Sequence, residues 1–221
     1  MAAVRLPKET EMILKFRALF EAFSRLIDGR SYHAWVVAAA RLEREALLEK
    51  LATTEDGLLD REAEDRVKFC RKSAKGLKAT VLRRGRRSAV PKAVAADFGV
   101  HISPDAPQLR EIPANELVPG DLVELKSGDT VPADVRLLSC KDFLLDQSAL
   151  TGDHAPVRKY AGMGEGKTLH DFPNIALAGT KVVSGSALGV AIMGGPVERR
   201  TVKFQAESVS HSAYGSLVPQ R

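Results

Sequence analysis

The pattern of apolar residues changes near residue 79, and this change limits the folds that are open to the chain. Before it, apolar residues recur at spacings of three or four, which predicts an amphipathic helix over about 10–28 that ends at Gly29. Its apolar face would carry Met12, Phe16, Leu19, Phe23 and Leu26. Further helices are expected over about 32–52 and 59–69, with Asp60 as a cap for the last one.

From residue 79 onward, short β-type runs alternate with Gly, Pro and Asp. The runs lie at 79–83, 121–125, 134–138, 143–146, 175–183 and 187–193. Such spacing predicts a compact antiparallel β-barrel or jelly-roll-like domain, with a hairpin turn at Gly185. The expected fold class is therefore α+β. We expect a helical N-terminal segment at 1–76, the β-domain at 77–195 and a disordered tail at 196–221.

Cysteine usage and the length of the apolar runs exclude several classes of protein. The two cysteines, Cys70 and Cys140, lie in no CxxC or Cys/His spacing, so neither a disulfide framework nor a zinc site is expected. The longest apolar run, at 35–40, is far shorter than the roughly 20 residues of a membrane helix. We expect no transmembrane span and no secretory signal, which favours a cytoplasmic location.

Basic residues are concentrated in one segment, which we call the basic block. Residues 71–96 contain nine Lys or Arg and no acid, although the net charge of the whole chain is only +5. The nine are Arg71, Lys72, Lys75, Lys78, Arg83, Arg84, Arg86, Arg87 and Lys92. A solvated face is the simplest explanation. The better functional one is contact with an anionic membrane surface, at the inner face of the plasma membrane. Nucleic-acid binding is not expected, because aromatic residues for base stacking are absent from the block.

Three short sequences follow one another in the second half of the chain. They are VPGD at 118–121, GDTVPAD at 128–134 and DQSALTG at 146–152. Each contains turn residues that any β-domain can use, but their order and spacing are specific. Together they resemble the actuator domain of P-type cation-transporting ATPases. With similar flanking sequences at 47–51, 57–66 and 174–187, the resemblance extends over about 42–195, and KDFLLDQ at 141–147 is most similar to magnesium-transporting members, with calcium pumps second.

The resemblance implies a role for the end of the third sequence. In this family a Thr-Gly-Glu loop positions the water that hydrolyses an aspartyl phosphate on the phosphorylation domain. The matching residues here are Thr151, Gly152 and Asp153, and Asp is one methylene shorter than Glu, a loss of about 1.3 Å of reach. A shift of about 1 Å can cost on the order of 100-fold in rate, so the loop is expected to be impaired even in a complete pump. That Asp153 is only a turn residue remains an equal alternative.

Parts of the family pattern do not occur in this sequence. Neither a membrane hairpin before the β-domain nor a DKTGT segment with the phosphorylated aspartate is found, so a truncated form without ATPase or transport activity of its own is expected. We expect no cofactor on the isolated chain; Mg²⁺ and ATP belong to the complete pump, and the phosphorylation domain is the implied partner. The alternative is a non-catalytic interaction protein that docks on a membrane or an intact pump through the basic block and helix 10–28.

Two further features are given no functional role. Residues 161–168, AGMGEGKT, fit a relaxed Walker A pattern, but the neighbouring residues predict a loop instead of the strand and helix that a P-loop needs. ATP binding through Lys167 is therefore not expected. The five histidines are not spaced as a ligand set, and a lone surface histidine such as His154 is usually no more than that.

Overall fold

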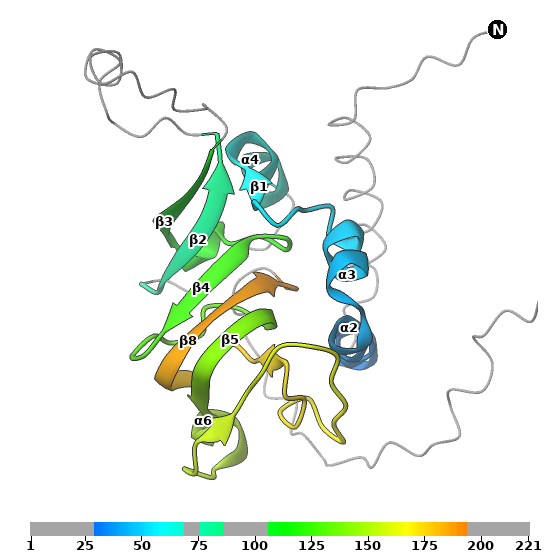
Figure 1. The fold of residues 1–221 in the computed structure, drawn as a ribbon, viewed down its shortest axis with the longest axis vertical. Helices are drawn as coiled ribbons and strands as arrows, with labels where there is room; N and C mark the ends of the chain where they lie inside the picture. Colours follow the sequence, from blue (N-terminus) through cyan, green and yellow to red (C-terminus); the bar gives the residue numbers. More distant parts are fainter. Residues whose placement is uncertain (1–28, 69–75, 86–105, 194–221) are drawn as a thin grey trace, which may run out of the picture.

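The computed structural model describes residues 29–68, 76–85 and 106–193, which form one large sheet with helices beside it (Figure 1). The expectations for helix 10–28, for the tail at 196–221, for Cys70 and for most of the basic block lie outside these residues. Among the described residues, no helix has the length and apolar character needed to cross a bilayer.

The N-terminal part of the described chain is helical, as predicted, but its helices are shorter than expected. The α-helices are α2 (Gly29–Arg41), α3 (Arg44–Lys50), α4 (Asp60–Val67) and α6 (Ser148–Thr151), and η1 (Ala114–Glu116) is a 3-10 turn. The single helix expected over 32–52 is broken because Glu43 has an extended backbone with ψ of 152°. The prediction that Asp60 caps α4 is wrong. The backbone N–H of Leu59 donates to the Glu62 carboxylate instead, and Asp60 forms an ion pair with Arg110 at 2.6 Å.

Eight strands form a mostly antiparallel sheet. They are β1 (Leu58–Leu59), β2 (Lys78–Arg84), β3 (Pro107–Pro113), β4 (Leu122–Lys126), β5 (Val135–Asp146), β6 (Val157–Arg158), β7 (Ile175–Ala176) and β8 (Lys181–Ala191). Their order is β1-β2-β4-β8-β5-β6, with β3 beside β2 and β7 beside β5, and only the β1–β2 pair is parallel.

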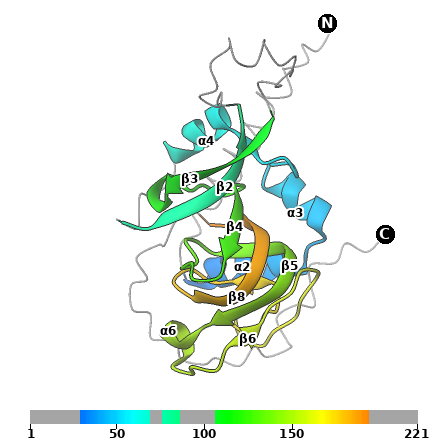
Figure 2. The ribbon, with the colours of Figure 1, turned by 60° about the vertical axis from the view of Figure 1, so that its left-hand side comes forward.

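The sheet formed by the described strands is open. No pairing joins β1 to β6, and α4 and β6 lie at opposite ends of the sheet in Figure 2. The α+β class and the mainly antiparallel pairing are thus confirmed, whereas a closed barrel is not. Both β1 and β6 contain only two residues, which leaves little edge through which the ends could pair.

The two longest strands, β5 and β8, replace the hairpin expected at 183–186. Gly185 lies inside the continuous strand β8, where its φ is +78°, and a side chain there would collide with the carbonyl oxygens of Lys141 and Asp142. The register between β5 and β8 shifts beside this point, between Lys141 and Leu144. The glycine therefore marks a bulge in a long strand pair, a feature that uses the same residue type as a hairpin turn.

Both faces of the sheet are covered by apolar side chains. Leu122 packs with Trp35, Leu47 and Phe172 in a cluster that includes α2 and α3, whereas its neighbour Val123 belongs to a second cluster around Phe143. This alternation is that of a strand buried on both sides. Figure 1 shows α2 and α3 along one side of the sheet, so the N-terminal helices share a core with the strands.

Candidate functional site

The Thr-Gly-Asp loop follows α6 and lies at the end of the sheet opposite α4 (Figure 1). Gly152 ends α6 with a φ of +77°, and its N–H donates to the Ser148 carbonyl at 2.8 Å. No atom outside the immediate chain lies within 4 Å of the position that a side chain on Gly152 would take. Residues 151–158 are all exposed, so this part of the loop is open to a partner.

Hydrogen bonds fix the conformation of the loop. The Thr151 hydroxyl donates to the Gln147 carbonyl at 3.2 Å and accepts the N–H of Asp153 at 3.1 Å. The carboxylate oxygen Oδ1 of Asp153 accepts the N–H of Ala155 at 2.9 Å, which is an Asx turn. The three sequence-predicted residues, Thr151, Gly152 and Asp153, are therefore held in one short structured turn.

The start of α6 ties this turn to the sheet. Gln147 is only 3% exposed, and its side-chain amide donates to the His170 carbonyl at 3.3 Å. Asp146 accepts the N–H of Ser148 at 2.8 Å. Hydrogen bonds from the Ser148 side chain and backbone hold the pKa of Asp146 below its usual value, and the charges of His154 and Lys181 act in the same direction. These hydrogen bonds therefore anchor the exposed loop to the sheet.

The VPGD sequence has a different environment, because its aspartate is completely buried. Asp121 accepts two hydrogen bonds from Arg83, at 2.7 and 2.6 Å, and a third from the N–H of Val118 at 2.9 Å. Gly120 has a φ of +96°, and a side chain on it would collide with the Arg66 guanidinium. Arg66 donates to the carbonyls of Leu51, Ala52 and Pro119, so this turn joins α3 and α4 to the sheet.

The GDTVPAD sequence is also tied to the core. Asp134 is 8% exposed and accepts the hydroxyl of Tyr32 in α2 at 2.7 Å and the N–H of Ala178 at 2.8 Å. Two of the three signature sequences therefore end in buried aspartates that hold helices and strands together. Asp153, which follows the third sequence, is exposed, as is Asp129 inside the second. Its place beside Thr151 and Gly152, and not exposure alone, makes Asp153 the candidate for chemistry.

Comparison with known families decides the identity of this region. Residues 100–204 match the family model of the P-type ATPase actuator domain. The chain carries a P-type ATPase actuator domain.

Relatives with named activities match part of the chain. The Probable cation-transporting ATPase F of Mycobacterium tuberculosis (strain H37Rv) is 45% identical over 85 residues, which are 38% of this chain and 9% of that protein. The Calcium-transporting ATPase of Bacillus subtilis (strain 168) is 43% identical over 84 residues, 37% and 9% of the two proteins. The Magnesium-transporting ATPase, P-type 1, of Escherichia coli (strain K12) is 40% identical over 89 residues, 38% and 10%.

The matched part of the chain thus spans about a tenth of the length of these relatives. Their names include calcium and magnesium transport at similar identity, so they do not single out one ion. A crystal structure of a zinc-transporting PIB-type ATPase has a TM-score of 0.34 at 22% identity, over 81% of this chain and 19% of that one. That likeness is too distant to add to the family assignment.

The glycine-rich sequence at 161–168 of the actuator chain packs against α2. The N–H of Gly164 donates to the carbonyl of Ala40 at 3.2 Å, and the Gly162 carbonyl accepts from Asn174 at 2.6 Å and from Arg136. A side chain on Gly164 would lie 2.8 Å from the Asn174 amide oxygen. The close packing of this loop accounts for two of its glycines, since a side chain on Gly164 would collide with Asn174 and one on Gly166 would collide with Asp171 and Phe172.

Sequence reasoning missed two buried cations beside this loop. Lys159 is 2% exposed and donates to the carbonyls of His170 and Phe172 at 2.7 and 2.8 Å, and burial lowers its pKa to about 8. Arg136 is also 2% exposed and donates to the Ala39 carbonyl at 3.3 Å, and burial lowers its pKa to about 10. Nothing in the local sequence distinguishes Lys159 and Arg136 from a Lys or Arg on the surface.

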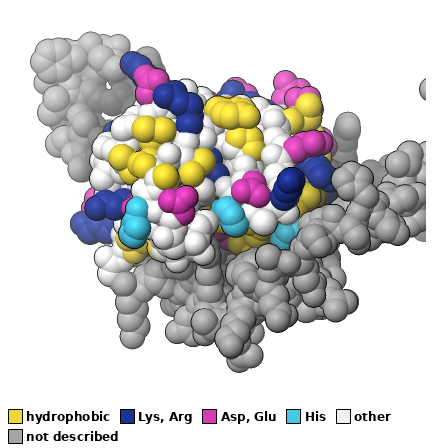
Figure 3. Space-filling view, turned by 90° about the horizontal axis from the view of Figure 1, so that it is seen from below, with side chains coloured by type: hydrophobic (Ala, Val, Ile, Leu, Met, Phe, Trp, Pro, Cys, Tyr) yellow, Lys and Arg dark blue, Asp and Glu magenta, His cyan; other side chains and the backbone are white. Residues whose placement is uncertain are grey.

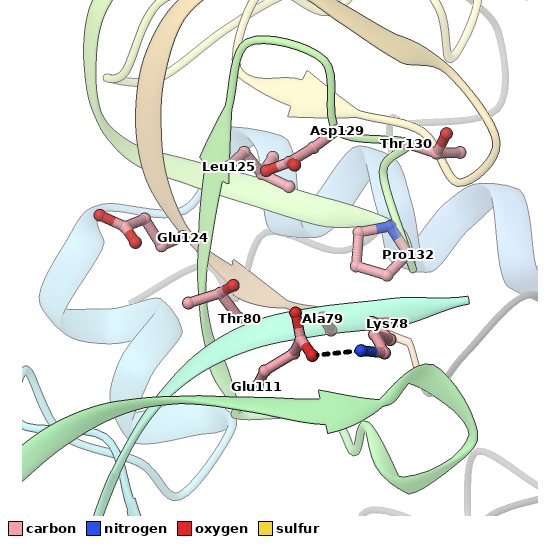
Figure 4. Close-up of a pocket in the computed structure, with 9 residues that line it drawn as sticks. All are labelled: Lys78, Ala79, Thr80, Glu111, Glu124, Leu125, Asp129, Thr130 and Pro132. Carbon is pink, nitrogen blue, oxygen red and sulfur yellow. Dashed lines mark hydrogen bonds and ion pairs between the residues drawn. The ribbon is translucent and has the colours of Figure 1, made fainter. Parts of the chain in front are cut away.

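Acidic side chains around a small cavity do not form a metal site. The cavity, of about 90 Å³, lies between β2, β3, β4 and the 129–132 turn (Figure 4), with room for only a few waters. Lys78 points toward Glu111 at 2.6 Å, and Glu124 contacts Lys126 at 2.8 Å. Within the described ranges, no group of three or more His, Cys, Asp or Glu can hold a metal, and the histidines visible in Figure 3 lie apart.

The structure describes three of the nine residues of the basic block. Lys78 is paired with Glu111, Arg84 donates to the Gly57 carbonyl at 3.2 Å, and Arg83 is buried against Asp121. The expectation of a solvated basic face is therefore wrong for Arg83, because the carboxylate of the VPGD sequence neutralises it inside the protein. The other six residues lie outside the described ranges.

Proposed function

We propose that this actuator domain acts in the dephosphorylation of the aspartyl-phosphate intermediate of a magnesium-type P-type ATPase. Thr151, Gly152 and Asp153 are the residues that act, and the partner is the phosphorylation domain of the complete pump, at the cytoplasmic face of the membrane. The observation that carries the proposal is the contrast between Asp153, which is exposed at the end of a fixed loop, and Asp121 and Asp134, the buried aspartates that end the other two signature sequences.

The chemistry requires a carboxylate that can orient one water molecule. That water attacks the phosphorus atom, the bond between phosphorus and the aspartyl oxygen breaks, and inorganic phosphate and a free aspartate are formed. Asp153 accepts the proton that the attacking water loses. The Thr151 hydroxyl and the left-handed Gly152 position the carboxylate, and the exposure of residues 151–158 leaves space for a phosphorylated partner.

The proposal assigns no cofactor to the isolated chain. Mg²⁺ and ATP take part in the complete pump, where other domains bind them. The small cavity beside β3 has the volume of a few waters and is far smaller than a nucleotide. The alternative of an interaction protein that docks through the basic block is weakened, because Arg83 of that block is buried in an ion pair with Asp121.

A hybrid pump tests the proposal. Residues 115–160 replace the corresponding segment of a complete magnesium-type pump, and phosphoenzyme formation from ATP and its hydrolysis are measured separately. Asp153→Asn removes the base but keeps an oxygen for the turn, so the phosphoenzyme should form normally and then persist, with hydrolysis slowed by about 100-fold. Asp142→Asn is the matched control, because its carboxylate is 80% exposed and lies outside the loop. Equal hydrolysis rates for the Asp153→Asn hybrid and the unmodified hybrid would remove Asp153 from the mechanism.

A further inference from the structure

We propose that the backbone N–H of Ala155 holds the Asp153 carboxylate in a parked position, and that this bond must break before the carboxylate can act. The inference rests on the proposed function, since it concerns how the same loop is controlled. Ala155 is then a positioning residue that acts through its backbone, and no side chain of its own is involved.

The evidence is a continuous series of hydrogen bonds from the core to the carboxylate. It begins at buried Gln147, whose carbonyl accepts the Thr151 hydroxyl at 3.2 Å. The same hydroxyl accepts the N–H of Asp153 at 3.1 Å, and Asp153 Oδ1 accepts the N–H of Ala155 at 2.9 Å. The carboxylate is therefore turned back toward its own chain, on the side of the residues that follow it.

The length of the aspartate side chain makes this arrangement possible. An Asx turn closes when a side-chain oxygen one methylene from the backbone accepts the N–H two residues later. A glutamate at the same position has an additional methylene, so the same compact ring no longer forms. The Asp-for-Glu difference thus has two consequences at once: the carboxylate has a shorter reach, and one of its oxygens is bound within the loop.

These two consequences can be separated experimentally, because they concern different atoms. If reach limits the loop, only a longer side chain at position 153 restores the rate. If the parked bond limits it, removal of the Ala155 N–H also raises the rate. Ala155→Pro removes that donor and leaves the Asp153 side chain unchanged. Ala155→Gly is the matched control, since it changes the side chain and keeps the N–H.

The first measurement uses the complete 221-residue chain and does not depend on a pump. The exchange of the Ala155 amide proton with solvent is followed by NMR in the unmodified chain, in Asp153→Asn and in Asp153→Ala. We expect exchange to be several-fold slower in the unmodified chain and in Asp153→Asn, which keep an oxygen to accept this N–H, than in Asp153→Ala. Equal exchange rates in the unmodified chain and in Asp153→Ala would overturn the parked position.

The second measurement uses the hybrid pump described above. Loss of one exposed hydrogen bond should make phosphoenzyme hydrolysis about five-fold faster in Ala155→Pro than in the unmodified hybrid, with no increase in Ala155→Gly. An NMR-detected bond together with an unchanged rate in Ala155→Pro would mean that parking does not limit the loop, which overturns the inference. Failure of the proposed function gives a different result, because Asp153→Asn would then leave hydrolysis unchanged.

Discussion

Two regions of this actuator domain carry family signatures, and they use the same residue type in opposite ways. Asp121 and Asp134 are buried and accept hydrogen bonds from Arg83 and Tyr32, which come from distant parts of the chain. Asp153 is exposed, and the described partner of its carboxylate is a backbone N–H two residues away. The comparison shows that a signature sequence does not in itself indicate chemistry. The burial and the partners of each carboxylate distinguish a stabilising aspartate from one that is available to act.

The largest expected effect is on the buried side of this comparison. Asp121→Ala leaves the Arg83 guanidinium buried without its carboxylate, and loss of one partner of such a pair costs about 3–5 kcal/mol of unfolding free energy. Urea denaturation of the full chain measures the change. Asp129→Ala, at an exposed turn of the neighbouring GDTVPAD sequence, should change stability by less than about 1 kcal/mol. A loss below about 1 kcal/mol in Asp121→Ala would break the comparison.

Lys159, which is buried a few residues after the exposed loop, gives an effect that depends on pH. Its pKa of about 8 is below the ordinary value of 10.5, so the unfolded chain binds more protons than the folded chain between these values. The contribution of Lys159 to stability should therefore rise from about pH 8 to pH 10.5, by up to about 3 kcal/mol, and be lost as the pH falls again. Lys159→Met should remove this rise. Denaturation curves between about pH 7 and pH 10.5 test it, and the same rise in both proteins would contradict it.

Two glycines in left-handed conformations allow the buried and the exposed region to be compared through smaller losses of unfolding free energy. Gly120 has a φ of +96° and lies against Arg66 and the Leu51 carbonyl, whereas Gly152 has a φ of +77° with open space around it. Gly152→Ala should cost only the backbone strain, about 1 kcal/mol, while Gly120→Ala adds a collision in the core and should cost about 2–4 kcal/mol. Thermal unfolding of the two variants gives the difference directly. Equal losses of stability in the two variants would show that the residues around Gly120 can shift to accommodate a side chain at little energetic cost.

The sequence predicted the class of the fold and the position of the loop because both follow from local patterns. Short β-type runs and turn residues predict strands without knowledge of the tertiary structure. The spacing of the three signature sequences can likewise be measured along the sequence alone. Gly185 was assigned to a hairpin because a glycine in a bulge and a glycine in a turn look alike without knowledge of the partner strand. The break at Glu43 has no Gly or Pro to mark it in the sequence.

The roles of the buried polar residues were beyond reach for a related reason. The pair of Arg83 and Asp121 is separated by 38 residues, and that of Tyr32 and Asp134 by 102, so no local pattern links them. Arg83 was therefore placed in a solvated basic face. The carboxylate of Asp60 was assigned to a helix cap because Asp60 occupies the usual cap position in the sequence. In the structure it forms an ion pair with Arg110 instead. For Arg83 and for Asp60, a long-range ion pair replaced the role that the local sequence suggests.

The smallest expected effect is on the exposed side of the comparison. Asp153→Ala removes the oxygen that accepts the Ala155 N–H, but both groups are exposed and water can replace the lost partner. The expected loss of unfolding free energy is about 0.5–1 kcal/mol, several-fold smaller than for Asp121→Ala. Asp153→Asn should lose almost nothing, because its amide oxygen accepts the same N–H. Urea denaturation of the three variants places the two aspartates on one scale. A loss of more than about 2 kcal/mol in Asp153→Ala would show that the loop is part of the folding core, and Asp153 would then resemble Asp121 in role as well as in sequence context.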